Sequence, residues 1–302
     1  MSRADKTSRP NGAIRQDPYS AITDQILADL SQGVTPWTKP WTAGHAAGPV
    51  SRPLRHSLEP YSGINTLGLW GAALERGYGA PIWMTFKQAL ELGGAVRKGE
   101  SGTTVVYANR ITRQETNEQG EDVERSIPFL KAYRVFNVEQ IDGLPERFQA
   151  APPTLPESER IARADAFLAA TQAQVTHGGD QACYDLIADR IRIPVFGAFA
   201  TSHDYYATRA HETVHWTRHS SRLDRDLGCK TFGDEGYARE ELVAELGAAF
   251  LCAELGVDLR PRADHAAYIG SWLKVLEGDK RAIFGAAAHA QKAVDYLKAL
   301  VG

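Results

Sequence analysis

The chain is 302 residues long, with 43% hydrophobic residues, 24% charged residues and a formal net charge of −3, which is ordinary for a globular protein. This balance excludes a protein that attracts polyanions through a strongly basic overall field, and no apolar run is long enough for a membrane span. The polar start does not resemble a signal peptide, and the three scattered cysteines lack metal-site spacing. We therefore expect a cytoplasmic protein of one large or two ordinary domains, with no membrane partner.

Three helices are predicted in the first third of the chain. Residues 1–16 are polar and predict a disordered N-terminus. Pro18 stands at the first position of a predicted helix that ends near Gly33. A second helix is predicted around residues 64–76, and Thr85 is expected to cap a short third helix.

Two strand-like runs follow these helices, at residues 103–109 and 129–137. Both runs are rich in Val, Tyr and Phe, which favour strands. The polar segment 113–126 between them is expected to be an exposed hairpin loop. The first part of the chain is thus predicted to be an α+β domain that contains a β-hairpin.

A Pro-rich stretch at residues 146–157 predicts a linker between a first domain over residues 17–145 and a second domain over residues 158–302. The second domain is predicted to be mostly helical, and the whole protein to be of the α+β class. The extended stretch 189–194 is either an edge strand to which a peptide substrate could add, or simply a strand of the domain's sheet. Besides two helices described next, this domain is expected to have helices near residues 157–173, 263–276 and 280–300.

The most specific motif of the chain is His211-Glu-Thr-Val-His215. On a helix, for which Ser202 or Asp204 could be the cap, His211 and His215 present two imidazoles to one ion. Glu212 then lies beside that ion as a general base for a metal-activated water. A catalytic zinc site needs a third protein ligand and one open position, so the ligand must come from elsewhere in the chain.

A second amphipathic helix, beginning near Gly236, offers that ligand. Glu241 and Glu245 are four residues apart on the face opposite the apolar stripe. We expect Glu241 to be the third ligand and Glu245 to accept the free N–H of a histidine, with Glu240 as the remaining alternative ligand. The predicted cofactor is Zn²⁺, with another divalent metal such as Mn²⁺ as an alternative. The simpler interpretation is that these glutamates only solvate the helix.

Four other side chains lie near this motif in the sequence. His219 continues the helical series one turn beyond the ion, and we expect it not to ligate. A phenol near the metal could stabilise an oxyanion, but packing roles are expected for Tyr205, Tyr206 and Tyr237.

Basic and aromatic residues alternate in the first domain. Once the acidic segment 113–126 is set aside, this domain has a moderate basic excess. Cations for the phosphate backbone and rings for unstacked bases suit single-stranded nucleic acid, although such tryptophans are more often core residues. Trp37 and Trp41, in a Pro-rich loop, are expected to be exposed. The candidate DNA contacts are Trp37, Lys39, Trp41, Arg52, Arg55, Lys87, Arg97 and Lys98. The further basic and aromatic residues among them are Lys131, Arg134, Tyr61, Trp70, Trp83, Phe86, Tyr107 and Tyr133, of which Trp70 is expected to be a core residue.

Several motifs in one order carry a family resemblance. The N-terminal motifs are Pro36-Trp37, Tyr61-Ser-Gly-Ile-Asn65, Trp83-Met-Thr-Phe-Lys-Gln-Ala89, Gly93-Gly-Ala-Val-Arg-Lys-Gly-Glu100 and Val135-Phe-Asn-Val-Glu-Gln140. They resemble the single-stranded-DNA-binding domain of ArdC-type antirestriction proteins, which also begins TraC-type conjugative primases. The segment from Ile193 through the His211 motif to Glu245 resembles the zincin-like metallopeptidase domain that completes ArdC. The resemblance implies a plasmid-encoded protein that binds single-stranded DNA, and also double-stranded DNA, and protects incoming plasmid DNA during conjugation.

Three functional hypotheses follow. In the first, a working, gluzincin-like zinc peptidase is delivered to DNA and cleaves a restriction enzyme or another DNA-bound protein. In the second, the chain coats DNA and its metal site is structural or inactive. In the third, the chain is a cytoplasmic zinc peptidase that cleaves a regulator, which would not need the aromatic and basic first domain. The presence of Glu212 favours retained chemistry, and DNA binding is expected to be the primary act.

Overall fold

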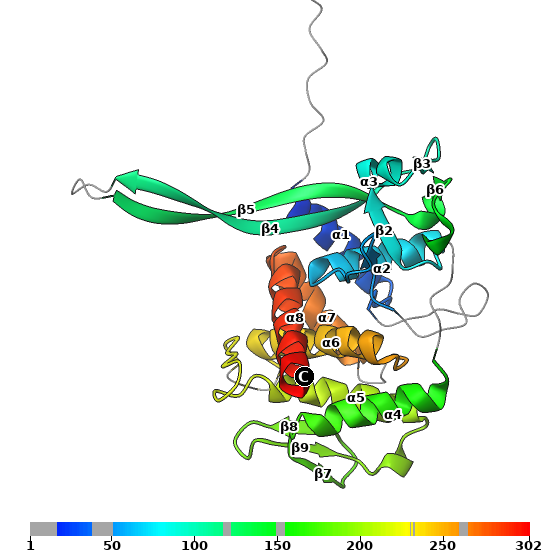
Figure 1. Cartoon of the computed structure of the whole chain (residues 1–302). Helices are drawn as coiled ribbons and strands as arrows, with labels where there is room; N and C mark the ends of the chain where they lie inside the picture. Colours follow the sequence, from blue (N-terminus) through cyan, green and yellow to red (C-terminus); the bar gives the residue numbers. More distant parts are fainter. Residues whose placement is uncertain are drawn as a thin grey trace, which may run out of the picture.

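The computed structural model describes residues 17–37, 51–116, 122–148, 155–229, 231, 233–259 and 265–302. The predicted disordered N-terminus, residues 1–16, and the candidate contacts Lys39 and Trp41 lie outside the described residues. Figure 1 shows an N-terminal sheet and a C-terminal sheet at opposite ends of the molecule, with helices between them.

The N-terminal part is built on a four-stranded sheet with the order β1-β2-β5-β4. The predicted helix over residues 64–76 is confirmed, and so is the cap at Thr85. The Thr85 hydroxyl accepts the Gln88 N–H at 3.3 Å while the Gln88 side chain accepts the Thr85 N–H at 2.8 Å, which satisfies two helix-end donors. The elements of this part are α1 (Pro18–Ser31), β1 (Leu54–Arg55), α2 (Ile64–Arg76), β2 (Ile82–Thr85), α3 (Phe86–Glu91), β3 (Ala95–Val96), β4 (Thr103–Thr116), β5 (Asp122–Asn137) and β6 (Ile141–Asp142).

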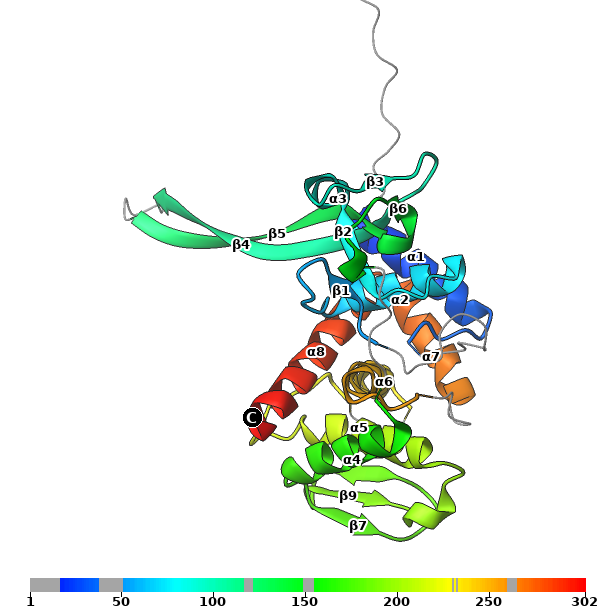
Figure 2. The ribbon, with the colours of Figure 1, turned by 45° about the vertical axis from the view of Figure 1, so that its right-hand side comes forward.

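Strands β4 and β5 form a long hairpin that projects from the body of the molecule (Figures 1 and 2). Their antiparallel register runs from Thr103 opposite Val135 to Thr116 opposite Asp122. The predicted loop over residues 113–126 is therefore wrong, because strand pairing continues through most of it. The described side chains of this outer part of the ribbon are mainly exposed on both faces, so the segment is polar without being irregular.

The C-terminal part has a three-stranded sheet with the order β7-β9-β8. Strand β9 pairs on both sides, in parallel with β7 and antiparallel with β8. The alternative that residues 189–194 form an edge strand is therefore wrong. The elements of this part are α4 (Glu157–Ala170), β7 (Val175–His177), β8 (Cys183–Asp185), β9 (Arg190–Ile193), α5 (Ser202–Trp216), α6 (Glu235–Leu255), α7 (His265–Gly278) and α8 (Ala282–Val301).

One hydrophobic core crosses the predicted boundary between the two domains. The Trp37 ring lies 5.9 Å from that of Trp272 on α7, and Trp70 on α2 lies 5.9 Å from Phe250 on α6. Helix α1 also packs against α7, and α2 contacts α8 (Figure 2). Phe148, in the predicted linker, is buried against the N-terminal sheet. The domain boundaries stay a prediction, but the largest core cluster contains residues of both halves, beside two smaller clusters of the N-terminal half alone.

Among the residues that the structure describes, no helix combines the length and the apolar character needed to cross a membrane. The cytoplasmic location expected from the sequence stays a prediction.

Candidate metal centre

Helix α5 brings His211 and His215 to the same buried face. Its N-cap is Thr201, whose hydroxyl accepts the Asp204 N–H at 3.2 Å, so the expected caps Ser202 and Asp204 are each wrong. The two imidazole rings lie 4.8 Å apart between centroids, and their Nε2 atoms face each other at 3.2 Å. The helical spacing in the sequence therefore produces the predicted pair of metal-binding nitrogens.

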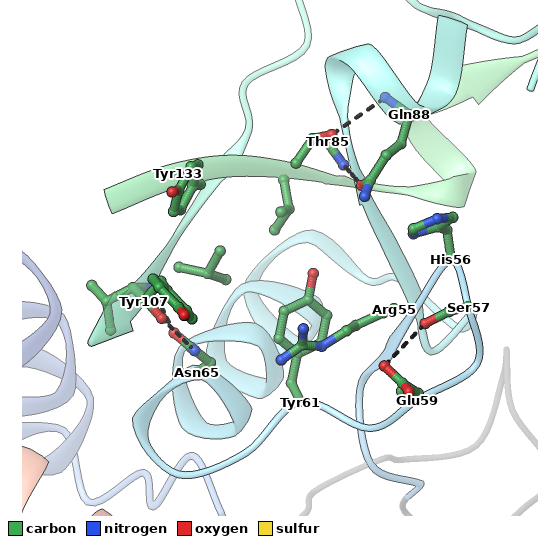
Figure 3. Close-up of a pocket in the computed structure, with 13 residues that line it drawn as sticks. Arg55, His56, Ser57, Glu59, Tyr61, Asn65, Thr85, Gln88, Tyr107 and Tyr133 are labelled. Carbon is green, nitrogen blue, oxygen red and sulfur yellow. Dashed lines mark hydrogen bonds between the residues drawn. The ribbon is translucent and has the colours of Figure 1, made fainter. Parts of the chain in front are cut away.

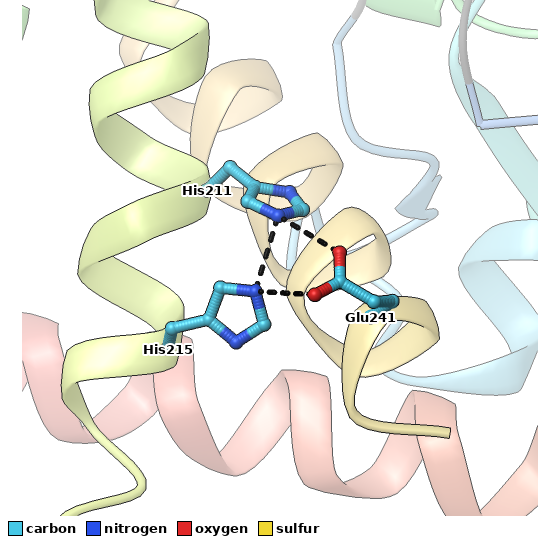
Figure 4. A group of neighbouring side chains, drawn as sticks. All are labelled: His211, His215 and Glu241. Carbon is cyan, nitrogen blue, oxygen red and sulfur yellow. Dashed lines mark hydrogen bonds and ion pairs between the residues drawn. The ribbon is translucent and has the colours of Figure 1, made fainter. Parts of the chain in front are cut away.

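Helix α6 packs against α5 and adds a carboxylate to this pair (Figure 4). The Glu241 Oε2 atom lies 3.5 Å from His211 Nε2, and Oε1 lies 3.4 Å from His215 Nε2. Candidate ligand atoms of the three residues all lie within 4.8 Å of one another, and all three residues are buried. Two imidazole nitrogens and a carboxylate form a donor set that suits zinc and similar divalent ions.

The spacing of these atoms fits a bound ion. Around a tetrahedral metal with metal–nitrogen bonds of about 2.0–2.1 Å, two ligand atoms lie about 3.3–3.4 Å apart. The observed separations of 3.2, 3.4 and 3.5 Å are close to that value. Helix packing alone thus holds the three side chains at the separation that a divalent cation requires.

Two further glutamates of α6 contact the outer nitrogens of the histidines. Glu245 Oε1 lies 3.2 Å from His211 Nδ1, and Glu240 Oε1 lies 3.1 Å from His215 Nδ1. A contact of Glu245 with the outer nitrogen of a histidine was expected from the sequence, but that of Glu240 was not, because Glu240 was considered only as an alternative ligand. Carboxylates at this position fix the orientation of metal-binding imidazoles.

Arg225 is a site residue that sequence reasoning missed. Its guanidinium donates to both carboxylate oxygens of Glu240, at 2.7 and 2.9 Å, and to the carbonyl oxygen of Val214 at 3.0 Å. It lies in the irregular segment between α5 and α6, where no periodic pattern marks it. The arginine neutralises Glu240 and also satisfies a carbonyl near the C-terminal end of α5.

The electrostatics of the site favour a cation. Burial lowers the pKa of His215, but the Glu241 charge and hydrogen bonds with Glu240 and Glu241 outweigh it and raise this pKa to about 10. Burial opposes ionisation of Glu240, yet hydrogen bonds from Arg225 and His215 hold its pKa at about 2. Burial likewise opposes ionisation of Glu241, while the two histidines lower its pKa below the ordinary value of 4.5. Ionised buried carboxylates need a positive partner, which protons or a metal can provide.

Tyr237 and Glu212 adjoin the same site. Glu212 is only 3% exposed and lies next to His211 on α5. The Tyr237 hydroxyl lies 3.1 Å from that of Tyr268, and its pKa is raised by burial, by Tyr268 and by Glu241. Tyr237 lies in the first turn of α6, one turn before the carboxylate of Glu241.

The other nearby candidates lie away from the ligand atoms. His219 follows the end of α5, and its Nδ1 atom contacts the hydroxyl and accepts the N–H of Ser221. Tyr205 and Tyr206 pack against each other, 5.0 Å apart, and against Phe196. The packing roles expected for these two tyrosines are confirmed.

Two of the candidate DNA contacts are buried, and the expectation that Trp37 is exposed is wrong. Its side chain is 2% exposed, because the Pro-Trp turn folds against Trp272 of α7. Arg52 is 5% exposed and forms an ion pair with Glu254 at 2.8 Å. It also donates to Gln291 at 2.6 Å and lies over the Phe250 ring, so it joins the two halves of the chain.

The remaining described candidates, Arg55, Lys87, Arg97 and Lys98, are exposed. Lys87, on α3, lies 3.6 Å from Glu91, and Arg97, after β3, pairs with Glu100 at 2.9 Å. Lys98 is exposed next to Arg97, whereas Arg55 lines a separate cavity near β1. Lys39 and Trp41 lie outside the part of the chain that the structure describes.

Comparisons with known proteins match the N-terminal and the C-terminal parts of the chain to two different domain families. Residues 162–289 match the family described as zincin-like metallopeptidase, and residues 16–136 match the N-terminal domain of anti-restriction factor ArdC. The fold and the site thus define a two-domain protein that joins an ArdC-type N-terminal domain to a zincin-like domain, and the predicted α+β class is confirmed. A divalent metal ion is the cofactor implied for this class of site.

The solved structures extend the similarity over both domains. A metal-free crystal structure of the antirestriction ArdC protein from the R388 plasmid has a TM-score of 0.78 and 44% sequence identity, and the match covers 94% of this chain and 98% of that one. A Mn(II)-bound structure of the same protein matches with a TM-score of 0.77 and 43% identity, over 95% and 98% of the two chains. The chain belongs to the ArdC family of antirestriction proteins, which confirms the resemblance found in the sequence.

The chain also resembles proteins of other lengths. An uncharacterized protein of Sinorhizobium fredii is 40% identical, over 94% of this chain and 92% of its own length. Two Escherichia coli proteins named DNA primase TraC are 39% and 38% identical, over 95% and 93% of this chain. The chain spans only 27% and 20% of those two primases.

Proposed function

We propose that this chain is a DNA-binding antirestriction protein that protects incoming plasmid DNA during conjugation and carries a peptidase-competent metal centre. The observation that carries the proposal is the match to the R388 antirestriction protein over 94% of this chain and 98% of that one. A match of both halves in one order supports a shared function better than either domain alone would. The match to part of two proteins named DNA primase TraC supports single-stranded DNA as the partner, with double-stranded DNA as a further one.

The chemistry proposed for the metal centre follows from its residues. His211, His215 and Glu241 would hold zinc, or manganese as in the R388 relative. A divalent cation bound there would polarise water and a peptide carbonyl. Glu212 would accept the proton of the attacking water and return it to the leaving amine. Glu240 and Glu245 would keep the imidazoles oriented.

DNA binding is proposed as the primary act, and peptide hydrolysis as a capability whose protein substrate would be a restriction enzyme or another DNA-bound protein. The buried Glu212 beside two aligned imidazoles favours a competent site over a purely structural one, since a structural ion needs no base. The alternative, a DNA-coating protein, differs only in that its metal site would be structural or inactive. A peptidase that cleaves a regulator would give no reason for the ArdC-type N-terminal domain.

The proposal is tested by DNA binding of the full chain, because the N-terminal half shares its core with α6, α7 and α8. We expect labelled single-stranded oligonucleotides to bind with an affinity that falls as salt increases. Lysine and arginine side chains that contact the phosphates release the counterions of the DNA, and added salt opposes this release. Double-stranded DNA of the same sequence is measured in parallel. An absence of binding to either form at low salt would contradict the proposal.

A further inference from the structure

A cavity of about 400 Å³ lies at the base of the hairpin, away from the metal centre (Figure 3). The loop after β1, helix α2, strands β4 and β5 and the start of α3 line it. Small-ligand sites have volumes of roughly 300–1,000 Å³, so the cavity can hold a group of nucleotide size. Its lining includes Arg55, His56, Tyr61, Tyr107 and Tyr133.

Two of the three tyrosines of this cavity, Tyr107 and Tyr133, are held in place but remain accessible, whereas Tyr61 is buried. Tyr107 and Tyr133 are 50% and 45% exposed, although both come from paired strands. The Asn65 side chain fixes the inner edge, because its amide donates to the Val106 carbonyl and its oxygen accepts the Val106 N–H, both at 2.8 Å. Arg55 lies 5.1 Å from the centre of the Tyr61 ring and is exposed. Rigid rings with an open face are suited to stacking.

The hairpin continues this aromatic surface on one of its two faces. In the antiparallel register, Val105 is opposite Tyr133, Tyr107 is opposite Lys131 and Asn109 is opposite Phe129, so odd-numbered residues share a face. The Tyr107 and Phe129 rings lie 6.3 Å apart, and the Lys131 ammonium lies 5.2 Å from the Phe129 ring centre. The exposed large hydrophobic residues of the hairpin are Tyr107, Ile111, Ile127 and Tyr133, all on this odd-numbered face.

The charges of the hairpin are also unequal between its faces. The described odd-numbered positions carry three cations, Arg113, Arg125 and Lys131, against the single carboxylate of Glu115. Within the β4–β5 register, the described even-numbered positions carry two cations and two carboxylates and no aromatic ring, with the charges at Arg110, Arg134, Asp122 and Glu124. Phe136 of β5 lies beyond this register, opposite Met84 of β2. Rings and cations therefore coincide on the odd-numbered face, which is continuous with the cavity.

We propose that the cavity receives one unstacked base of single-stranded DNA, and that the strand continues along the odd-numbered face of the hairpin. The inference rests on the proposed DNA-binding function and assigns a site to it. Tyr107 and Tyr133 provide the stacking rings, and Lys131 contacts the adjacent phosphate. Glu59, which also lines the cavity, repels phosphate, so the base enters and the backbone stays outside. A base held in a duplex must first be unpaired, which favours single strands.

The experiment combines a change in the protein with a change in the DNA. Oligo-dT and the same oligonucleotide with abasic positions are titrated against the wild-type full chain and the variants Tyr107→Ala/Tyr133→Ala and Tyr107→Phe/Tyr133→Phe. Loss of a stacked base weakens binding by roughly tenfold or more, so we expect the wild type to bind abasic DNA that much more weakly. The alanine variant should bind both oligonucleotides alike, and the phenylalanine variant should behave as the wild type.

A charge control separates the two faces of the hairpin. Lys131→Ala and Arg110→Ala each remove one exposed cation from the same ribbon, at odd- and even-numbered positions respectively. We expect only Lys131→Ala to reduce the salt dependence of single-strand binding, by about 0.7 in the log–log slope for one lost phosphate contact.

The outcomes distinguish this inference from the function on which it rests. If the wild type binds no DNA, the proposed function and the site both fail. If the wild type binds but loses nothing on abasic DNA, or if the alanine variant keeps the same discrimination, only the base site is overturned. Equal effects of Lys131→Ala and Arg110→Ala would overturn the strand path along the odd-numbered face.

Discussion

Glu240 and Arg225 form a fully buried ion pair behind the candidate metal centre. Both side chains are 2% exposed, and two guanidinium nitrogens of Arg225 lie 2.7 and 2.9 Å from the two carboxylate oxygens of Glu240. Since Glu240 also contacts His215 Nδ1 at 3.1 Å, the arginine is linked through one carboxylate to the imidazole of a candidate metal ligand. The position of His215 therefore depends on a residue from the irregular segment between α5 and α6.

Replacing Arg225 should strongly destabilise the protein. Arg225→Ala leaves a buried carboxylate without its main partner, and we expect a loss of about 3–5 kcal/mol in the free energy of unfolding. Chemical denaturation of the wild type and the variant measures this loss. The matched control is Arg239→Ala, because Arg239 pairs with Glu235 at 2.5 Å on the surface of α6 and is 40% exposed. That variant should lose about 1 kcal/mol or less, and equal losses for the two would contradict the assignment.

The three glutamates of α6 should differ in their effect on metal affinity. Glu241→Gln removes a proposed ligand and should weaken binding of Zn²⁺ or Mn²⁺ the most. Glu240→Gln and Glu245→Gln alter only the orientation of the imidazoles, and we expect affinity to fall by about 10- to 100-fold. Glu235→Gln, at the exposed start of α6, is the control. Titration calorimetry gives the order, and a smaller effect at Glu241 than at Glu240 would identify a different ligand.

Asp189 should make stability depend on pH in the acid range. Its carboxylate accepts from Arg222 at 3.0 Å and from the Tyr184 hydroxyl at 2.7 Å, and Arg222 in turn lies over the Trp216 ring. The hydrogen bond from Arg222 is the main cause that lowers the pKa of Asp189 below 3.8. A lowered folded-state pKa stabilises the protein above the unfolded-state value, and this contribution disappears as pH falls through the folded-state value.

The variant Asp189→Asn tests this expectation, and asparagine tolerates the positive φ of 46° at this position. Wild type should be more stable than the variant at neutral pH, and the difference should shrink as pH falls below about 4. Urea midpoints measured from neutral pH to about pH 3 provide the comparison. A difference that does not change with pH would show that the charge of Asp189 contributes nothing.

Trp37 should matter for stability and not for DNA affinity. Trp37→Ala removes a large buried ring beside Trp272, and we expect a cost of about 3–5 kcal/mol in the free energy of unfolding. At a temperature where the variant is folded, its affinity for single-stranded DNA should equal that of the wild type. If Trp37→Ala bound single-stranded DNA more weakly but were as stable as the wild type, Trp37 would stack on DNA bases, as expected from the sequence.

The parts of the fold that could be predicted are those determined by residues close together in the sequence. Gly77, with φ of 72°, ends α2 where the sequence indicated, and the Thr85 and Gln88 side chains define the start of α3. The same applies to part of the metal centre, because the spacing of His211 and His215 places both nitrogens on one helix face. The place of Glu241 depends on the packing of α6 against α5, since the residues of α6 from Glu240 to Cys252 are all buried and no single apolar face orients the helix.

The features that could not be predicted depend on contacts between distant parts of the chain. Trp37 is buried because its partner Trp272 lies in the other half of the chain, which a Pro-rich sequence cannot indicate. Arg225 has no periodic pattern around it, so its pair with Glu240 was not foreseen. The full hairpin was missed because its outer residues face solvent on both sides and lack the alternation that marks a strand.

We propose that DNA binding, and not proteolysis, is the primary act of this protein. This proposal is tested most directly by the entry of an unmodified plasmid, by conjugation, into a restricting recipient that expresses the wild type or Glu212→Gln. Folding, metal binding and DNA affinity of the variant are measured beforehand and should match the wild type. We expect Glu212→Gln to protect the plasmid as well as the wild type does. Loss of protection, with those three properties preserved, would contradict it and make peptide hydrolysis essential.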